Sequence, residues 1–297
     1  MVRLPALRST PAIARAFCVL AGLAAAPVAA TDIVAYRGGG GLYPENTTEA
    51  LGAAFGIGVD GVHVTVAITA DDIPIAIHDL NFDGDLTRRP DGSLFGAYQP
   101  PVRNFSFREI QAFNVGRPDE NSALWRRRTE LTPVDGAPPP ALSQVFMVAR
   151  RARNKTATLW IEALASPLRR ESHPKPVPYA RLIARTVDRA RAVDRTVLLS
   201  RDWSILQAMR LVEPEMRLGC MTIEARWLDT VQRGVIDPSP WLGGVDADDH
   251  PGTPEAALAA GCAIWAPHAD GVRAGEIARA QSLGLEVALW PVDAPGA

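Results

Sequence analysis

The second half of the sequence alternates short apolar segments with longer amphipathic ones. From Ala141 onward, five helix-like segments are each followed by a strand-like one, at 142–151 and 157–163, 179–192 and 196–199, 204–212 and 216–221, 254–260 and 262–265, and 272–283 and 286–290. This order is typical of βαβ units, whose strands run parallel. Because no dinucleotide-type glycine loop opens any of these helices, we expect an α/β fold of the (β/α)8 TIM-barrel type and not a doubly wound sheet. A further short strand is considered at 243–245.

Strands are also expected near the start of the chain, at 33–36, 59–68 and 73–77, with a helix at 49–55. In the second of these strands, apolar residues at even positions alternate with His63 and Thr65, so the two sets lie on opposite faces. Polar side chains also follow the other two strands. Because the carboxyl ends of parallel strands meet at one end of a barrel, we expect three pairs to converge there: Tyr36 with Arg37, His63 with Thr65, and His78 with Asp79.

The composition favours one large domain. Residues 31–297 are enough for a single α/β domain, and a hydrophobic content of 47% can fill its core. Residues 80–140 are rich in Asp, Arg, Pro and Gly and have no long period, so we expect an irregular insertion over the barrel mouth with a helix at 107–112. The net charge of −2 argues against a nucleic-acid partner, because such proteins usually present a basic face.

Residues 1–30 have the pattern of an export signal. Arg3, Arg8 and Arg15 give a positive start, residues 16–26 are apolar, and small residues precede Thr31. A membrane anchor is the alternative, but the apolar stretch is shorter than the roughly 20 residues that a spanning helix needs. The sequence therefore predicts a secreted or periplasmic protein that begins near Thr31 and keeps no stable membrane span.

Several short motifs follow one another in a recognisable order. Near the start these are Arg37-Gly38, PENT at 44–47, Thr69 with Asp71, and His78-Asp79. Later come PALSQVF at 140–146, LWIEAL at 159–164, SRDWSIL at 200–206 and VALWPVD at 287–293. Together they resemble the glycerophosphodiester phosphodiesterase family, a group of metal-dependent, phospholipase-C-like TIM-barrel phosphodiesterases. Each motif alone is weak, and the order carries the resemblance.

The resemblance implies a set of site residues and also several replacements. Tyr36 stands where the family has its first His, His63 and Thr65 stand at its carboxylate pair, and Leu164 stands at its Lys. Arg37, His78 and Glu162 are retained. The implied roles are catalytic for His78, Tyr36 and Arg37, substrate-binding for Arg37 and Trp290, metal-binding for Glu162, His63 and Thr65, and supporting for Glu45 and Asp79.

The replacements bear on the metal. The family uses one divalent cation, Ca²⁺ or Mg²⁺, and these cations prefer charged oxygen ligands. A set of His63, Thr65 and Glu162 has lost two carboxylates, so we expect it to bind such a cation weakly, although His with Glu could suit a transition metal. Tyr36 has an ordinary pKa near 10, so it would be a poor base but could act as an acid, nucleophile or hydrogen-bond donor.

By resemblance, the function is hydrolysis of a glycerophosphodiester to an alcohol and glycerol phosphate. Arg37 would hold the phosphodiester, and His78 would protonate the leaving oxygen or activate the attacking group. The alternative is an impaired member that binds a small-molecule phosphodiester without cleaving it. Unrelated hydrolase chemistry is a third possibility, which no Ser-His-Asp or Cys-His pattern supports. The alcohol and the oligomeric state stay open.

Two further expectations concern the second half of the chain. Cys220 and Cys262 are the cysteines that follow the signal, and export permits a disulfide, but their spacing leaves pairing open. After the strand at 286–290 only a few residues follow, without the final helix and strand of the family. We expect the strand at 33–36 to pair directly with 287–290; a retained signal covering the gap, or a truncated product, are the alternatives.

Overall fold

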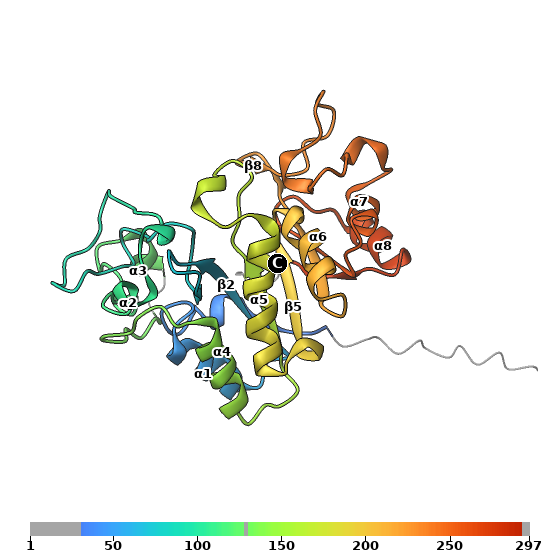
Figure 1. The fold of residues 1–297 in the computed structure, drawn as a ribbon. Coiled ribbons are helices and arrows are strands. Elements are labelled where there is room, and N and C mark those ends of the chain that lie inside the picture. The colour runs from blue at the N-terminus through green and yellow to red at the C-terminus, as the bar shows by residue number, and fades with distance from the viewer. Residues whose placement is uncertain (1–30, 128–129, 293–297) are drawn as a thin grey trace, which may run out of the picture. The chain divides into compact units, whose positions relative to one another are not determined.

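The computed structural model has a curved, mainly parallel sheet with helices along its outer face (Figure 1). It describes residues 31–127 and 130–292, so the expected signal at 1–30 lies outside the described residues. The strands are β1 (Val34–Ala35), β2 (Gly61–Ile68), β3 (Pro74–Ala76), β4 (Thr158–Ala163), β5 (Thr196–Ser200), β6 (Arg217–Thr222), β7 (Glu224–Ala225), β8 (Leu228–Asp229), β9 (Ile264–Pro267) and β10 (Glu286–Val287).

The α-helices are α1 (Thr48–Ile57), α2 (Phe107–Ile110), α3 (Ala123–Arg127), α4 (Leu142–Arg151), α5 (Pro176–Ala190), α6 (Trp203–Val212), α7 (Thr253–Ala259) and α8 (Ala274–Ser282). Short 3-10 turns are η1 (Tyr36–Gly38), η2 (Val102–Asn104), η3 (Arg170–Ser172), η4 (Val193–Arg195), η5 (Pro240–Leu242) and η6 (Ala247–Asp249). No helix among the described residues is both long enough and apolar enough to cross a membrane.

The strand order confirms the expected barrel class. Neighbouring strands run β1-β2-β4-β5-β6-β9-β10, and each adjacent pair is parallel. Helices α4, α5 and α6 each connect or follow strands of this path, as the alternation predicted. All of these strands therefore direct their carboxyl ends to the same end of the sheet, which is where barrels of this type carry their functional residues.

One strand runs in the opposite direction to the one expected. Strand β3 is antiparallel to β2 and lies off the main path, with Val66 opposite Ala76 and Ile68 opposite Pro74. The reason is the short connection: the turn at residues 69–73 is too brief for the crossover that a parallel pair requires. Strand β3 consequently returns from the tip of β2 toward the mouth, where it delivers His78.

Two other expectations are wrong. Within the described residues β1 pairs with β2 and β10 with β9, so the strands at the two ends of the sheet do not pair with each other. The expected strand at 243–245 is also missing, because Gly243 and Gly244 have φ values of 61° and 89°. Such left-handed conformations end the η5 turn and are incompatible with a strand.

The two faces of the sheet carry different cores. Outward residues such as Val62, Ile161 and Leu198 pack against the helices in the large cluster. Inward residues form a smaller cluster whose members are Trp160, Val197, Leu199, Met221, Ile264 and Ala266. Val34 of β1 and Ala288, just after β10, both pack against this inner cluster. The sheet therefore curls around a shared interior even though its two end strands do not pair with each other.

The region at 80–140 has a core of its own. Four phenylalanine rings, from Phe82, Phe95, Phe105 and Phe113, contact one another with centroid separations of 5.1 to 5.8 Å. The cluster extends to Ala67 of β2 and to Leu164 just after β4. These contacts attach the irregular segment to the carboxyl ends of two barrel strands.

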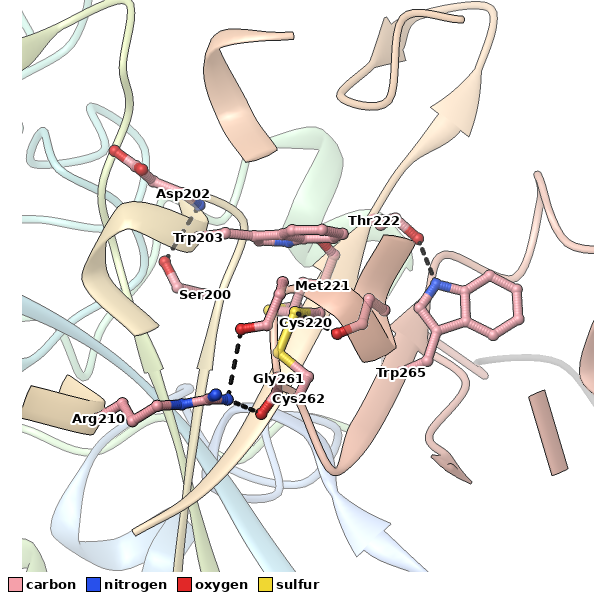
Figure 2. Close-up of a disulfide and its surroundings, with 12 residues drawn as sticks. Ser200, Asp202, Trp203, Arg210, Cys220, Met221, Thr222, Gly261, Cys262 and Trp265 are labelled. Carbon is pink, nitrogen blue, oxygen red and sulfur yellow. Dashed lines mark hydrogen bonds between the residues drawn. A yellow bond between two sulfur atoms is a disulfide. The ribbon is translucent and has the colours of Figure 1, made fainter. Parts of the chain in front are cut away.

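A disulfide joins Cys220 of β6 to Cys262, which precedes β9 (Figure 2). Both residues are buried, and their Cα atoms are 5.8 Å apart. The strand register alone does not pair them, because Cys220 lies opposite Trp265. Cys262 lies in the turn between α7 and β9, and this turn brings it to Cys220 on the helix-facing side of the sheet.

We expect the double variant Cys220→Ala with Cys262→Ala to be less stable than the oxidised protein. The sequence separation of 42 residues corresponds to about 4 kcal/mol of unfolding free energy in the chain-entropy model. Urea denaturation of both proteins under the same conditions measures the difference. Equal midpoints and slopes would contradict the prediction.

Candidate active site

The mouth of the barrel gathers residues from five segments. Tyr36 and Arg37 follow β1, His63 and Thr65 lie on β2, and Glu162 lies on β4. Glu162 and Thr65 are direct neighbours in the strand register. His78 arrives from β3, and Glu45 comes from the loop before α1. The mouth therefore contains most of the residues that the sequence singled out.

The backbone after β1 is arranged around Arg37. Arg37 has a left-handed conformation with φ of 48°, and Gly38 and Gly39 follow with φ of 71° and 85°. The backbone carbonyl of Arg37 accepts a hydrogen bond from the backbone amide of Asn46 at 2.9 Å, across the loop. The next element is held in place as well, because Thr47 caps α1 by accepting from the amide of Ala50.

Glu45, His78 and Arg37 form one connected group. Glu45 Oε1 contacts His78 Nδ1, and Glu45 Oε2 accepts from Arg37 Nη1 at 3.2 Å. Arg37 Nη1 lies 2.9 Å from His78 Nδ1 and 3.2 Å from Nε2, so the guanidinium is placed over the imidazole. The Glu45 carboxylate is buried, whereas the His78 side chain keeps 29% of its exposure. Because part of the imidazole is exposed, His78 can exchange a proton with a ligand at the mouth.

Arg37 stays cationic at this site. Burial alone would lower its pKa, but the charge and hydrogen bond of Glu45 more than compensate and raise the pKa above its ordinary value. The Arg37 side chain retains 21% exposure. It is therefore a permanently charged donor that can contact an anion from the solvent side.

Tyr36 and His63 lie beneath this group. Their rings stack with centroids 5.0 Å apart and an interplanar angle of 13°. His63 Nδ1 accepts from the backbone N–H of Arg37 at 3.3 Å, so this imidazole is used within the protein and is buried. Burial raises the pKa of the Tyr36 phenol, which the charge of Arg37 only partly offsets. Tyr36 therefore stays protonated near neutral pH and can donate a proton or a hydrogen bond.

Glu162 is held by two cationic or proton-donating groups. Arg201, the residue after β5, places Nε 3.2 Å from Glu162 Oε1, and His63 Nε2 lies 3.4 Å from Oε2. Burial by itself would raise the pKa of Glu162, but Arg201 and His63 outweigh it and lower the pKa to about 2. The carboxylate is 3% exposed and ionised, so it needs these partners.

Arg201 and Asn46 are the residues that sequence reasoning missed. Asn46 donates from Nδ2 to Thr65 Oγ1 at 3.0 Å and accepts from the Thr65 amide at 3.2 Å. The Thr65 hydroxyl in turn donates to the carbonyl of Ile77 at 2.6 Å. Thr65 therefore links the loop, β2 and β3. A signal for Arg201 was available, because a charged residue directly follows a predicted barrel strand.

Two predicted site residues, Trp290 and Asp79, contact other parts of the protein. Trp290 donates from its indole to the carbonyl of Ala266 at 2.7 Å and packs edge-on against His268. Asp79 accepts from the amide of Leu80 and lies 3.7 Å from Arg169. Neither contact joins these side chains to the group of Glu45, His78 and Arg37.

These features define a class of protein: a barrel with a cationic and acid–base site at its mouth. A model of the glycerophosphoryl diester phosphodiesterase family matches residues 37–296. This chain therefore belongs to the glycerophosphoryl diester phosphodiesterase family, as the ordered motifs indicated.

Two curated relatives match parts of the chain. An uncharacterised protein of Mycobacterium tuberculosis H37Rv is 28% identical over 191 residues, which are 62% of this chain and 54% of that protein. A glycerophosphodiester phosphodiesterase of Caldanaerobacter subterraneus subsp. tengcongensis is 33% identical over 86 residues, or 29% of this chain and 31% of that protein. The chain thus spans about half or less of the length of these relatives.

Solved structures share the fold. A Silicibacter pomeroyi DSS-3 protein assigned to the glycerophosphoryl diester phosphodiesterases has a TM-score of 0.79 at 24% identity, covering 89% of this chain and 84% of its own. An Oleispira antarctica phosphodiesterase, solved with the product sn-glycerol-3-phosphate, has a TM-score of 0.61 at 16% identity, with coverages of 89% and 85%.

Members of this family typically bind a divalent metal. The residues of this chain do not fit a hard divalent cation. Thr65 Oγ1 already donates one hydrogen bond and accepts another, and a guanidinium lies against Glu162. Across the described residues no three or more His, Cys, Asp or Glu side chains are grouped so that they could hold a metal ion.

Proposed function

We propose that the protein hydrolyses a glycerophosphodiester to an alcohol and glycerol phosphate. The observation that carries the proposal is the connected group of Glu45, His78 and Arg37 at the barrel mouth. It combines a fixed cation with an imidazole that is partly exposed at the mouth. Family membership supports the reaction class, and the product bound to the Oleispira antarctica protein supports a small-molecule phosphodiester as ligand.

The phosphoryl group would be held by two guanidinium groups. Arg37 and Arg201 both sit above buried carboxylates, and their side chains keep 21% and 26% exposure. Each can keep its carboxylate contact and direct other N–H groups toward an anion, since a guanidinium has five donors. Donors fixed in this way would stabilise the charge that develops on the phosphoryl oxygens.

Proton transfer would fall to His78, with Glu45 orienting it. Near neutral pH an imidazole can take a proton from the attacking hydroxyl or water and return it to the leaving oxygen. Tyr36, whose phenol stays protonated, would serve as a donor and not as a base. These assignments retain the roles that the resemblance implied for His78, Tyr36 and Arg37.

Arg201 would replace the family's metal at Glu162. A guanidinium that already compensates the buried carboxylate removes the negative charge that attracts Ca²⁺ or Mg²⁺. Glu162, His63 and Thr65 would then be internal supports of the site and not ligands. This replacement agrees with the weakened metal binding that the sequence predicts.

Turnover of glycerophosphocholine should therefore be low and should not rise when Ca²⁺ or Mg²⁺ is added. The comparison is made on protein stripped with EDTA, with free choline measured, and metal content of the purified protein is determined in parallel. Turnover that requires Ca²⁺ or Mg²⁺ would contradict the role given to Arg201 while leaving the hydrolase proposal intact.

A binding protein without catalysis is the second candidate. It is favoured by the placement of the second imidazole, because His63 is buried and its Nδ1 accepts a backbone hydrogen bond. Proton transfer would then depend on His78 without a second imidazole. Measurable affinity for sn-glycerol 3-phosphate, lost in Arg37→Ala, together with no turnover of any glycerophosphodiester would establish this alternative.

The segment at 80–140 would select the alcohol group. A pocket beside Glu45 and His78 is lined on its other side by Leu86, Val115 and Leu131 of that segment. We propose that it is an insertion within one domain of residues 31–297.

We also propose that residues 1–30 direct export to the periplasm or the exterior. The buried Cys220–Cys262 disulfide supports an oxidising compartment. Sequencing the N-terminus of protein recovered from the medium or periplasm should show a start near Thr31. An intact Met1 on exported protein would contradict this.

A further inference from the structure

A groove of about 850 Å³ runs between α4 and α5 on the outer face of the sheet. Figure 1 shows these two helices as neighbours over the middle of the sheet. Its lining includes Ala157, just before β4, and Leu159 of β4. The volume falls within the range of small-molecule sites, roughly 300–1,000 Å³.

Cationic side chains concentrate at this groove. Its lining includes Arg150, Lys155, Arg185, Arg189, Arg191 and Arg195, although the chain as a whole has a net charge of −2. In residues 31–127 and 130–292, ion pairs involve Arg37, Arg103, Arg117, Arg169, Arg201, Arg217, Arg233 and Arg279 and none of these six cations. The acidic lining residue Asp72 is paired with Arg103 at 2.8 Å.

The helix dipoles explain the positions of only some of these cationic side chains. Arg150 and Arg189 lie in the last turns of α4 and α5, where a cation is favourable. Lys155, Arg191 and Arg195 lie beyond the helix ends. Arg195 donates to the carbonyl of Ala157 at 2.7 Å, while its buried Nε has no hydrogen-bond partner in the described part of the chain.

Charge and apolar surface are separated along the groove. The cations gather where α4 and α5 end, next to the amino ends of β4 and β5. Away from the helix ends the lining includes the apolar side chains of Phe146, Met147 and Leu182, with Ser143 and Asp72 as polar neighbours. Met147 is 39% exposed, so part of this apolar lining is open to solvent.

From this separation we propose that the groove binds a single-tailed amphiphile with a phosphate head. The head contacts the cations at the helix ends, and the tail lies along Phe146, Met147 and Leu182. Five of the six cations are arginines, which form paired hydrogen bonds with phosphate oxygens. An acidic helix would distribute its charges along the groove, whereas the cations here occupy one end. This ligand site is distinct from the mouth of the barrel.

The test measures binding of dodecyl phosphate to the full-length protein by calorimetry, below its micelle concentration. The matched probe is dodecylphosphocholine, which has the same tail and a compensated charge. We expect dodecyl phosphate to bind at least about 10-fold more tightly, and added salt to weaken it. Equal affinity for the two probes would overturn the proposal.

Variants locate the bound probe. Arg185→Glu with Arg189→Glu, and separately Met147→Gln, should each weaken dodecyl phosphate at least about 5-fold; all three side chains are exposed, so the fold should tolerate the changes. Arg37→Ala should leave this binding unchanged, because Arg37 belongs to the mouth. Binding lost in Arg37→Ala would place the probe in the active site and overturn the proposal, as would binding only of anionic vesicles or of an acidic peptide.

Discussion

Replacing His78 by alanine is expected to reduce kcat/KM for glycerophosphocholine by about 100- to 10,000-fold, the usual contribution of a positioned acid or base. His78 is the imidazole at the mouth whose Nδ1 contacts Glu45 and whose ring lies under the Arg37 guanidinium. Arg37 stays charged and Glu45 is buried, so the partly exposed imidazole is the group placed to exchange a proton with a ligand. The measurement is choline release in EDTA.

His250→Ala is the matched control, since this imidazole lies after η6 and outside the mouth. Its activity should equal that of the unchanged protein. Glu45→Gln should also reduce kcat/KM, because the amide cannot hold the imidazole through the same carboxylate contact. If His78→Ala kept full activity and the original pH profile, another residue would be the acid or base.

Replacing Arg201 by glutamine is expected to lower the free energy of unfolding by about 3–5 kcal/mol at neutral pH, as found when one partner of a buried ion pair is removed. Glu162 would keep its charge in an apolar surrounding with only His63 beside it. Affinity for sn-glycerol 3-phosphate should fall as well, because Arg201 is one of the two proposed phosphate donors. Urea denaturation and calorimetry measure the two effects.

The pH dependence of that stability has a definite sign. In the unchanged protein the pKa of Glu162 is about 2 against an ordinary value of 4.5, which corresponds to stabilisation on the order of 3 kcal/mol. This stabilisation is present above about pH 4.5, and it is lost as the pH falls toward the folded-state pKa of about 2. The deficit of Arg201→Gln should therefore be largest near pH 7 and shrink on acidification.

The double variant Arg201→Gln with Glu162→Gln separates charge from packing. Removing both charges should recover much of the stability lost in Arg201→Gln alone, because no buried charge is then left without a partner. The phosphate affinity should not recover. A double variant as unstable as the single one would mean that Arg201 acts through packing and not by compensating Glu162.

Local pattern was enough to predict the parallel strands, most of the helices and much of the site. The alternation after Ala141 defines units that can bury their apolar faces only against a common sheet, and the structure confirms them. The alternation in β2 places His63 and Thr65 inward by geometry alone. The ordered motifs around Arg37, His78 and Glu162 likewise indicate the family from the sequence alone.

The remaining features depended on contacts between distant segments. The direction of β3 follows from a turn too short for a crossover, and the disulfide depends on the turn between α7 and β9 that brings Cys262 to β6. In the described residues the end strands β1 and β10 pair with β2 and β9 and not with each other. Arg201 contacts Glu162 only because β5 lies next to β4, which places its guanidinium against the carboxylate.

Sequence alone therefore determined which residues face the barrel mouth, because that depends on a periodicity of two. The partners that those residues meet, and hence whether Glu162 faces a metal or an arginine, were decided by tertiary structure, because they depend on which strands become neighbours.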